Sequence, residues 1–189
     1  MSDTLKSKRK YNSVRRRTQA HETREQIIRA ARKLFIENGY AGATIDAIAS
    51  EAGVAPETVF AIFKNKRTIL ANLVAISVGG DDRQIHLLER PGPQSVLKET
   101  DPVRQIDRFA QDITTILERV APIFVIIRAA AKTEPEIADL LENLLKERLD
   151  NLARFIQNLS SHGPFREGME GTIAAETVWA ITSPEIFNL

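Results

Sequence analysis

Hydrophobic residues recur along the chain with the spacing of amphipathic helices. From His21 onward, apolar side chains follow the i, i+1, i+4, i+7, i+8 pattern of a helix with one buried face; they are Ile27, Ile28, Ala31, Leu34 and Phe35. Asn38 and Gly39 should end this helix, because glycine readily adopts the left-handed conformation that follows a last turn. No segment alternates with a period of two for long enough to predict a strand. The predicted fold class is all-α.

Two short helices are predicted next. Thr44 can cap a helix that Gly53 closes, and Pro56 is suited to the first position of a helix that runs to Phe63. A fourth helix should begin after Asn65 and fade at Gly79–Gly80.

The remainder also has helical spacing. Residues 79–100 read as a connection with at most one short helix near Gln94–Glu99. A long helix is expected from Asp101, kinked or interrupted at Pro122. Another is expected from a Thr133 cap to about Ser160, and a last one should end near Ser183–Pro184.

Composition excludes several classes of protein. The 189 residues are 43% hydrophobic and 27% charged, which is a globular balance, and they include no cysteine. Disulfide frameworks, iron–sulfur clusters and thiol catalysis are therefore excluded, and no metal or cofactor is expected. No apolar run approaches the ~20 residues that span a bilayer, and the N-terminus is charged, so no membrane partner and a cytoplasmic location are predicted.

Charge is distributed unevenly along the chain. Residues 1–20 carry a net charge of +6, residues 21–70 a net of +1, and residues 71–189 a net of −6. The first segment lacks apolar periodicity and is predicted to be a disordered basic arm. Such an arm indicates a polyanionic partner, although a merely solvated tail has the same composition.

The two short helices, Thr44–Ala52 and Pro56–Phe63, form a pair joined by a tight turn that contains Gly53. This is the helix-turn-helix arrangement, in which one helix enters the major groove and the preceding helix braces it. We therefore divide the chain into a basic arm (1–20), a helix-turn-helix domain (21–70) and a larger helical domain (71–189).

The stretch Thr23–Leu70 resembles the DNA-binding domain of the TetR family of bacterial transcriptional regulators. The resemblance is carried by Ala30, Ala31, Leu34, Phe35, Gly39, Tyr40, Thr44, Ile48, Ala49, Ala52, Gly53, Val54, Phe60, Phe63 and Lys66. It implies a three-helix DNA-binding domain, a linking fourth helix, and a helical domain that dimerises and binds a small-molecule effector. In one branch of this family the chain continues beyond the Trp179–Phe187 segment, so truncation at the C-terminus is an expectation.

The resemblance also implies a set of DNA-binding residues. Thr44 and Lys66 match phosphate-contacting positions, and the helix from Pro56 matches the recognition helix. The full set is Arg15, Arg16, Arg17, Thr44, Ala55, Pro56, Glu57, Thr58, Phe60, Ala61, Ile62, Lys64, Lys66 and Arg67.

Each of these assignments has a structural alternative. Phe60 has an apolar flank, which favours a core position over a DNA contact, and it lacks the hydroxyl of the tyrosine that the family often places there. Thr44 can serve only as a helix cap, and Lys66 can be an ordinary solvated lysine. Glu57 either accepts a hydrogen bond from cytosine N4 or points away from DNA.

A ligand site is expected where polar groups interrupt apolar helix stretches. Arg128 follows a continuous apolar run, and a buried guanidinium needs an anionic ligand or a carboxylate partner. We favour an ion pair with Asp112 or Glu118 over a ligand contact. The candidate ligand-binding residues are Arg108, Phe109, Asp112, Phe124, Arg128, Trp179 and Thr182.

The predicted function is a sequence-specific regulator that binds operator DNA as a homodimer, most simply a repressor released by a small-molecule effector. The alternative is a helical protein-interaction module whose basic arm binds nucleic acid non-specifically. An enzyme is not expected, because the three histidines are not spaced for metal binding or base catalysis and no phosphate loop or paired-carboxylate signature is present.

Overall fold

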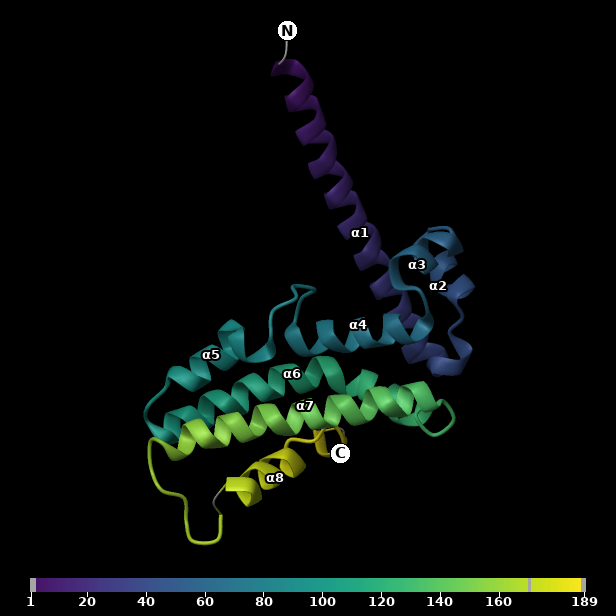
Figure 1. The fold of residues 1–189 in the computed structure, drawn as a ribbon. Coiled ribbons are helices and arrows are strands. Elements are labelled where there is room, and N and C mark those ends of the chain that lie inside the picture. Colours follow the sequence, from purple (N-terminus) through teal and green to yellow (C-terminus); the bar gives the residue numbers. More distant parts are fainter. Residues whose placement is uncertain (1–2, 170, 188–189) are drawn as a thin grey trace. The chain divides into compact units, whose positions relative to one another are not determined.

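The computed structural model describes the backbone of residues 3–169 and 171–187, and the side chains of that part from residue 15 onward. All regular structure in this part of the chain is helical, so the predicted all-α class is confirmed. The chain divides into two compact units, residues 1–70 and 71–189 (Figure 1).

The first unit contains α1 (Asp3–Gly42), α2 (Ile45–Ala52), α3 (Pro56–Phe63) and the first turn of α4 (Lys66–Gly79). Local sequence signals set the ends of the two short helices. The hydroxyl of Thr44 accepts a hydrogen bond from the Ala47 amide at 3.1 Å, and Gly53 ends α2 in the left-handed conformation at φ 68°. Pro56 occupies the first turn of α3.

Helix α1 differs from the prediction at its N-terminal end. Its backbone is helical from Asp3, where the sequence analysis expects a disordered arm and a helix only from His21. Residues 3–38 contain no glycine or proline that would end a helix. Because extending an existing helix is far easier than starting one, the helix of residues 21–38 continues toward the N-terminus. At the other end, Gly39 breaks the helical backbone with φ 68° and ψ 178°, as expected, and a last short turn follows.

The core of the first unit joins all of its helices. Apolar side chains of α1, α2, α3 and α4 are almost completely shielded from solvent; they include Ile27, Ala31, Phe35, Ile48, Val59, Phe63, Ile69 and Leu70. An ion pair at 2.7 Å between Lys33 of α1 and Glu51 of α2 adds a polar contact at the surface. The two short helices are therefore held by packing against α1.

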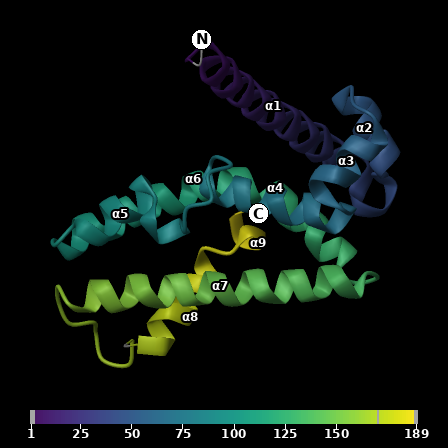
Figure 2. The same ribbon diagram turned by 45° about the horizontal axis from the view of Figure 1, so that its top comes forward.

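The second unit is built around two long helices. It contains most of α4, then η1 (Leu87–Glu89), α5 (Pro91–Lys98), α6 (Pro102–Ala130), α7 (Pro135–Ser160), α8 (Gly171–Ile181) and α9 (Pro184–Phe187). Helices α6 and α7 run antiparallel side by side, α5 packs on α6, and α8 packs on α7 (Figures 1 and 2). No helix in the described part of the chain is long and apolar enough to cross a membrane.

Two helix boundaries and the effect of Pro122 differ from the sequence analysis. α5 begins at Pro91 rather than near Gln94, because Pro91 is itself suited to a first helical position. Pro122 lies inside a continuous α6, where the buried neighbours Ala121 and Ile123 pack and hold the helix together. Glu134, not Thr133, precedes the first turn of α7.

The C-terminal end of α4 is held by two arginines of the second unit. Arg119 of α6 donates from Nε to the Ser77 carbonyl at 2.8 Å and from Nη2 to the Val78 carbonyl at 3.1 Å. The buried Arg90 donates to the Gly79 carbonyl at 2.7 Å and forms an ion pair with Asp81. These guanidinium groups satisfy carbonyls that a helix end leaves unpaired.

Candidate nucleic-acid interface and ligand site

Helix α3 presents one face to solvent and buries the other. Val59 and Phe63 are 0% and 1% exposed, so they fix the rotation of the helix against the core. The outward positions of α3 are Glu57, Phe60 and Ala61, which share one helical face, and the exposed Lys64 follows the last helical residue. This surface, which we call the α3 face, is the one available to a partner.

The position of Phe60 differs from the prediction. The sequence analysis favours a core position, but the side chain is 51% exposed. The core is already filled at this level by Val59 and Phe63, which lie on the opposite side of the helix. A large exposed aromatic ring is suited to apolar contact with a thymine methyl group in the major groove.

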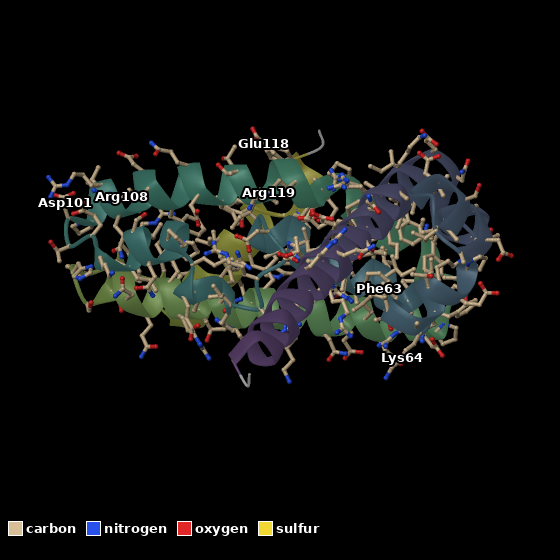
Figure 3. All side chains as sticks on the ribbon, turned by 90° about the horizontal axis from the view of Figure 1, so that it is seen from above. Phe63, Lys64, Asp101, Arg108, Glu118 and Arg119 are labelled. Carbon is tan, nitrogen blue, oxygen red and sulfur yellow. The ribbon has the colours of Figure 1, made fainter. Side chains whose placement is uncertain are left out.

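The backbone is strained where α3 ends. Lys64 adopts φ 64° and ψ −45°, and it is the only described residue other than glycine with a positive φ. The Asn65 amide donates to the Phe63 carbonyl at 2.7 Å, which closes a tight three-residue turn around Lys64. Strain of this kind is often retained at binding sites. The exposed Lys64 side chain lies at the outer edge of the first unit (Figure 3).

Lys66 is not an ordinary solvated lysine. Its Nζ atom donates to the Tyr40 carbonyl at 2.6 Å and lies 4.2 Å from the centroid of the Tyr40 ring. The start of α4 is thereby tied to the end of α1. Asn65 caps α4, which begins after it as predicted, since its side-chain oxygen accepts from the Thr68 amide at 2.8 Å.

The other predicted DNA-binding residues lie in three places. Thr44 and Ala55 are exposed at the starts of α2 and α3, while Pro56, Thr58, Ile62 and Arg67 are half-buried. Arg15, Arg16 and Arg17 are exposed on α1. The remaining basic residues of the arm, Lys6, Lys8, Arg9 and Lys10, lie outside the described side chains.

The predicted ligand-binding residues do not gather around one cavity. Arg108 and Arg128 lie on the same helix, and twenty residues of α6 separate them by about 30 Å. Arg108 is exposed near one end of α6, where it pairs with Glu99 at 3.1 Å (Figure 3). Phe109 is half-buried and stacks on Phe155 of α7 with ring centroids 4.1 Å apart.

Arg128 is not a buried guanidinium. Its side chain is 43% exposed, and it pairs with Glu185 of α9 rather than with Asp112 or Glu118. Ile126 and Ile127, which end the apolar run before it, are buried, but Arg128 itself lies on the outer face of α6. Sequence reasoning missed this partner because α9 lies 57 residues further along the chain.

Asp112 lies where α6 packs against α5. It is half-buried, and its carboxylate sits so close to Gly92 that a Cβ atom there would collide with it. Burial raises the pKa of Asp112, and the nearby positive charge of Arg119 opposes that shift. The group is therefore a desolvated carboxylate in a helix–helix contact.

Trp179 and Thr182 are joined by Arg148, which the sequence analysis did not identify. Arg148 Nη2 donates to the Trp179 carbonyl and to the Thr182 hydroxyl, each at 2.8 Å. Its guanidinium carbon lies 5.2 Å from the centroid of the Trp179 ring. Burial lowers the pKa of Arg148 to about 10, so the group stays charged at neutral pH. A signal was available in the sequence, because Arg148 interrupts the helical spacing of leucines at positions 141, 145 and 152.

The geometry of α2 and α3 defines a helix-turn-helix protein, and comparisons with known proteins agree. The family described as "Bacterial regulatory proteins, tetR family" matches residues 27–73. The HTH-type transcriptional repressor BepR of Brucella suis biovar 1 is 30% identical over 145 residues, which are 75% of this chain and 66% of that protein. The chain spans 60 to 66% of the length of the curated relatives that it matches over most of its own length.

Solved structures share the fold of most of the chain. A TetR-family regulator from Mesorhizobium loti superimposes with a TM-score of 0.67 at 20% identity, over 89% of this chain and 83% of that one. A complex of SmeT with triclosan gives a TM-score of 0.64 at 23% identity, over 88% and 83%. The chain belongs to the TetR family of bacterial regulatory proteins.

Proposed function

We propose that this protein is a sequence-specific DNA-binding transcriptional regulator that acts as a repressor. The observation that carries the proposal is the α3 face, an exposed helical surface whose orientation is fixed by buried residues of the same helix. A helix held in this way can enter the ~12 Å wide major groove as a rigid body. The relative BepR is named as a repressor, which supports this direction of control. A cytoplasmic location, where the operator is found, belongs to the same proposal.

Within this proposal the residues have separate roles. Glu57, Phe60 and Ala61 read base edges, and Lys64 lies at the edge of the groove near phosphates. Thr44 caps α2 and remains exposed to contact a phosphate through its hydroxyl. Lys66 acts mainly by positioning α4 on Tyr40, because its ammonium group already has these contacts.

The active form is proposed to be a homodimer. One recognition helix of eight residues contacts too few bases to select a site alone, and a two-fold pair presents two helices to half-sites ~34–36 Å apart. The dimer surface is assigned to α7 and α8, and on α8 the apolar side chains of Ile173 and Ile181 are exposed. Sedimentation at micromolar concentration tests the assignment, and a monomer there contradicts it.

Release from DNA is proposed to follow ligand binding in the second unit. A ligand can act only if it favours one arrangement of the recognition helices over another. Helix α4 links the two units covalently and can transmit such a change, because Lys66–Leu70 belong to the first unit and the following residues to the second. A coupling of ~1–3 kcal/mol changes operator affinity roughly 5–150-fold. The triclosan complex of SmeT supports an apolar small-molecule effector by analogy.

The test is a gel-shift titration with DNA from upstream of the protein's own gene, against unrelated DNA of equal length. Specific retention by the wild type is expected, and it should be lost when Phe60 and Lys64 are both replaced by alanine. Equal affinity for both DNAs would instead support a module that binds nucleic acid non-specifically.

A further inference from the structure

Two donors of the second unit are buried without an acceptor. Arg148 Nη1 and Trp179 Nε1 are both shielded from solvent, and neither has a hydrogen-bond partner among the residues that the structure describes. Leaving a buried donor unpaired costs as much as losing a hydrogen bond, and more when the group is charged. The two donors belong to neighbouring side chains, since the guanidinium stacks over the indole ring.

The structural role of Arg148 uses only part of its guanidinium. Nη2 caps the last turn of α8 through the Trp179 carbonyl and contacts the Thr182 hydroxyl. That hydroxyl in turn donates to the Val178 carbonyl at 2.6 Å, so its proton is already engaged. Nη1 and the indole N–H take no part in this cap, and a helix cap does not account for them.

A carboxylate of α9 interacts with two arginines of this region. Glu185 of α9 pairs with Arg128 of α6, and the same carboxylate acts electrostatically on Arg148. Glu185 therefore pairs directly with Arg128 and acts on Arg148 only through its field. The ion pair between Arg128 and Glu185 is weakly held, because the two side chains are 43% and 42% exposed and α9 is a single short turn.

An apolar surface leads away from Arg148 along α7. Leu152 and Phe155, one and two turns toward the C-terminus, are buried. Leu145 and Leu141, one and two turns in the other direction, remain only half-buried. A molecule with its charged end at Arg148 can therefore lay an apolar tail beside these two leucines.

We propose that Arg148, Trp179 and Arg128 form a binding site for a monocarboxylate with an apolar tail, for which the Glu185 carboxylate is the internal competitor. The ligand's carboxylate displaces Glu185 from Arg128, and its oxygens accept from Arg148 Nη1 and Trp179 Nε1, which become accessible only when the packing around them opens. Binding of a carboxylate stands on these contacts alone, whereas its role as the effector rests on the proposed function.

The test uses octanoate as the probe and octanamide as its uncharged counterpart. Trp179 is the only tryptophan in the chain, so its fluorescence reports directly on the site. Octanoate should change this fluorescence in a saturable manner, and octanamide should bind at least about 10-fold more weakly because it lacks the charge. No saturable change with octanoate, or equal binding of octanamide, overturns the proposal.

Three variants assign the contacts, with calorimetry as the readout where the tryptophan is lost. Arg148→Gln and Trp179→Phe should each weaken octanoate binding about 10-fold or more. Glu185→Gln should tighten it several-fold, because the internal competitor is removed. Glu185 lies at the surface and takes no part in the α8 cap, so Glu185→Gln keeps the proposal testable if Arg148→Gln fails to fold. The exposed Arg154→Gln on the same helix is the control and should leave binding unchanged.

Two further results would overturn the site. A third would overturn the proposed function and leave the site standing. If Arg148→Gln converts a dimer to monomers and octanoate has no effect on either form, the donors serve a second copy of the chain. If the wild type binds operator DNA but not octanoate, the regulator stands and the site fails. If octanoate binds and no DNA is retained specifically, the site stands and the proposed function fails.

Discussion

Phe60 shows how one residue can matter to binding without mattering to folding. Its ring is half exposed on the α3 face, so Phe60→Ala should change the free energy of unfolding by less than about 0.5 kcal/mol. Operator affinity should fall by about 1–3 kcal/mol, with the effect concentrated at one T·A pair. Urea unfolding and gel shifts with single-base operator variants measure both. The buried neighbour Val59→Ala is the matched control and should destabilise the protein by about 1–3 kcal/mol.

Lys64 combines a charge with a strained backbone, and two substitutions separate them. Lys64→Gly should raise the free energy of unfolding by up to about 1 kcal/mol, because glycine adopts φ 64° without strain, while operator affinity falls. Lys64→Ala should weaken operator binding by the same factor without the increase in stability. Both effects are measured by denaturant unfolding and gel shift. A glycine variant that is less stable than wild type would show that the turn is not strained.

At the scale of the elements, the boundaries that could be predicted are those with local signals. Thr44, Gly53 and Pro56 cap, end and begin helices through their own chemistry, and α2 and α3 begin and end where these residues indicate. The pairing of Arg128 with Glu185 and the capping of α8 by Arg148 depend on how distant helices pack. Periodicity identifies an apolar stripe but does not say which element covers it, so these partners could not be found from the sequence.

The contact between α5 and α6 makes stability depend on pH. Because burial raises the pKa of Asp112, the folded state binds its proton more tightly than the unfolded state does. The stability linked to this group is therefore fully present below its ordinary pKa of 3.8 and is lost as the pH rises through the folded-state pKa. Asp112→Asn should consequently be more stable than wild type at pH 7, with the difference disappearing below about pH 4.

Urea unfolding of both proteins between pH 3 and pH 7 measures this difference. Asp107→Asn, an exposed carboxylate on the same helix, is the control and should show no comparable trend. A variant less stable than wild type at pH 7 would mean that the attraction of Arg119 outweighs the burial of Asp112.

For the molecule as a whole, charge separates the two ends of the chain. Residues 1–20 carry a net of +6 and residues 71–189 a net of −6. A polyanion attracts the first segment and repels the second, so the field of the protein itself favours encounters in which the helix-turn-helix meets DNA. This selection acts before any base is read, and it weakens as salt screens the charges.

Deleting residues 1–17 tests this contribution, since the deleted segment carries seven basic groups and one acid. Binding to operator and unrelated DNA should weaken by similar factors, because phosphate binding carries no sequence information. The slope of log affinity against log salt should become shallower by ~0.9 for each phosphate that the protein no longer neutralises. Fluorescence anisotropy at several salt concentrations measures both quantities. Replacing Arg15, Arg16 and Arg17 with glutamine removes charge at full length and should give part of the same change. An unaltered slope in both proteins would mean that the segment does not bind DNA.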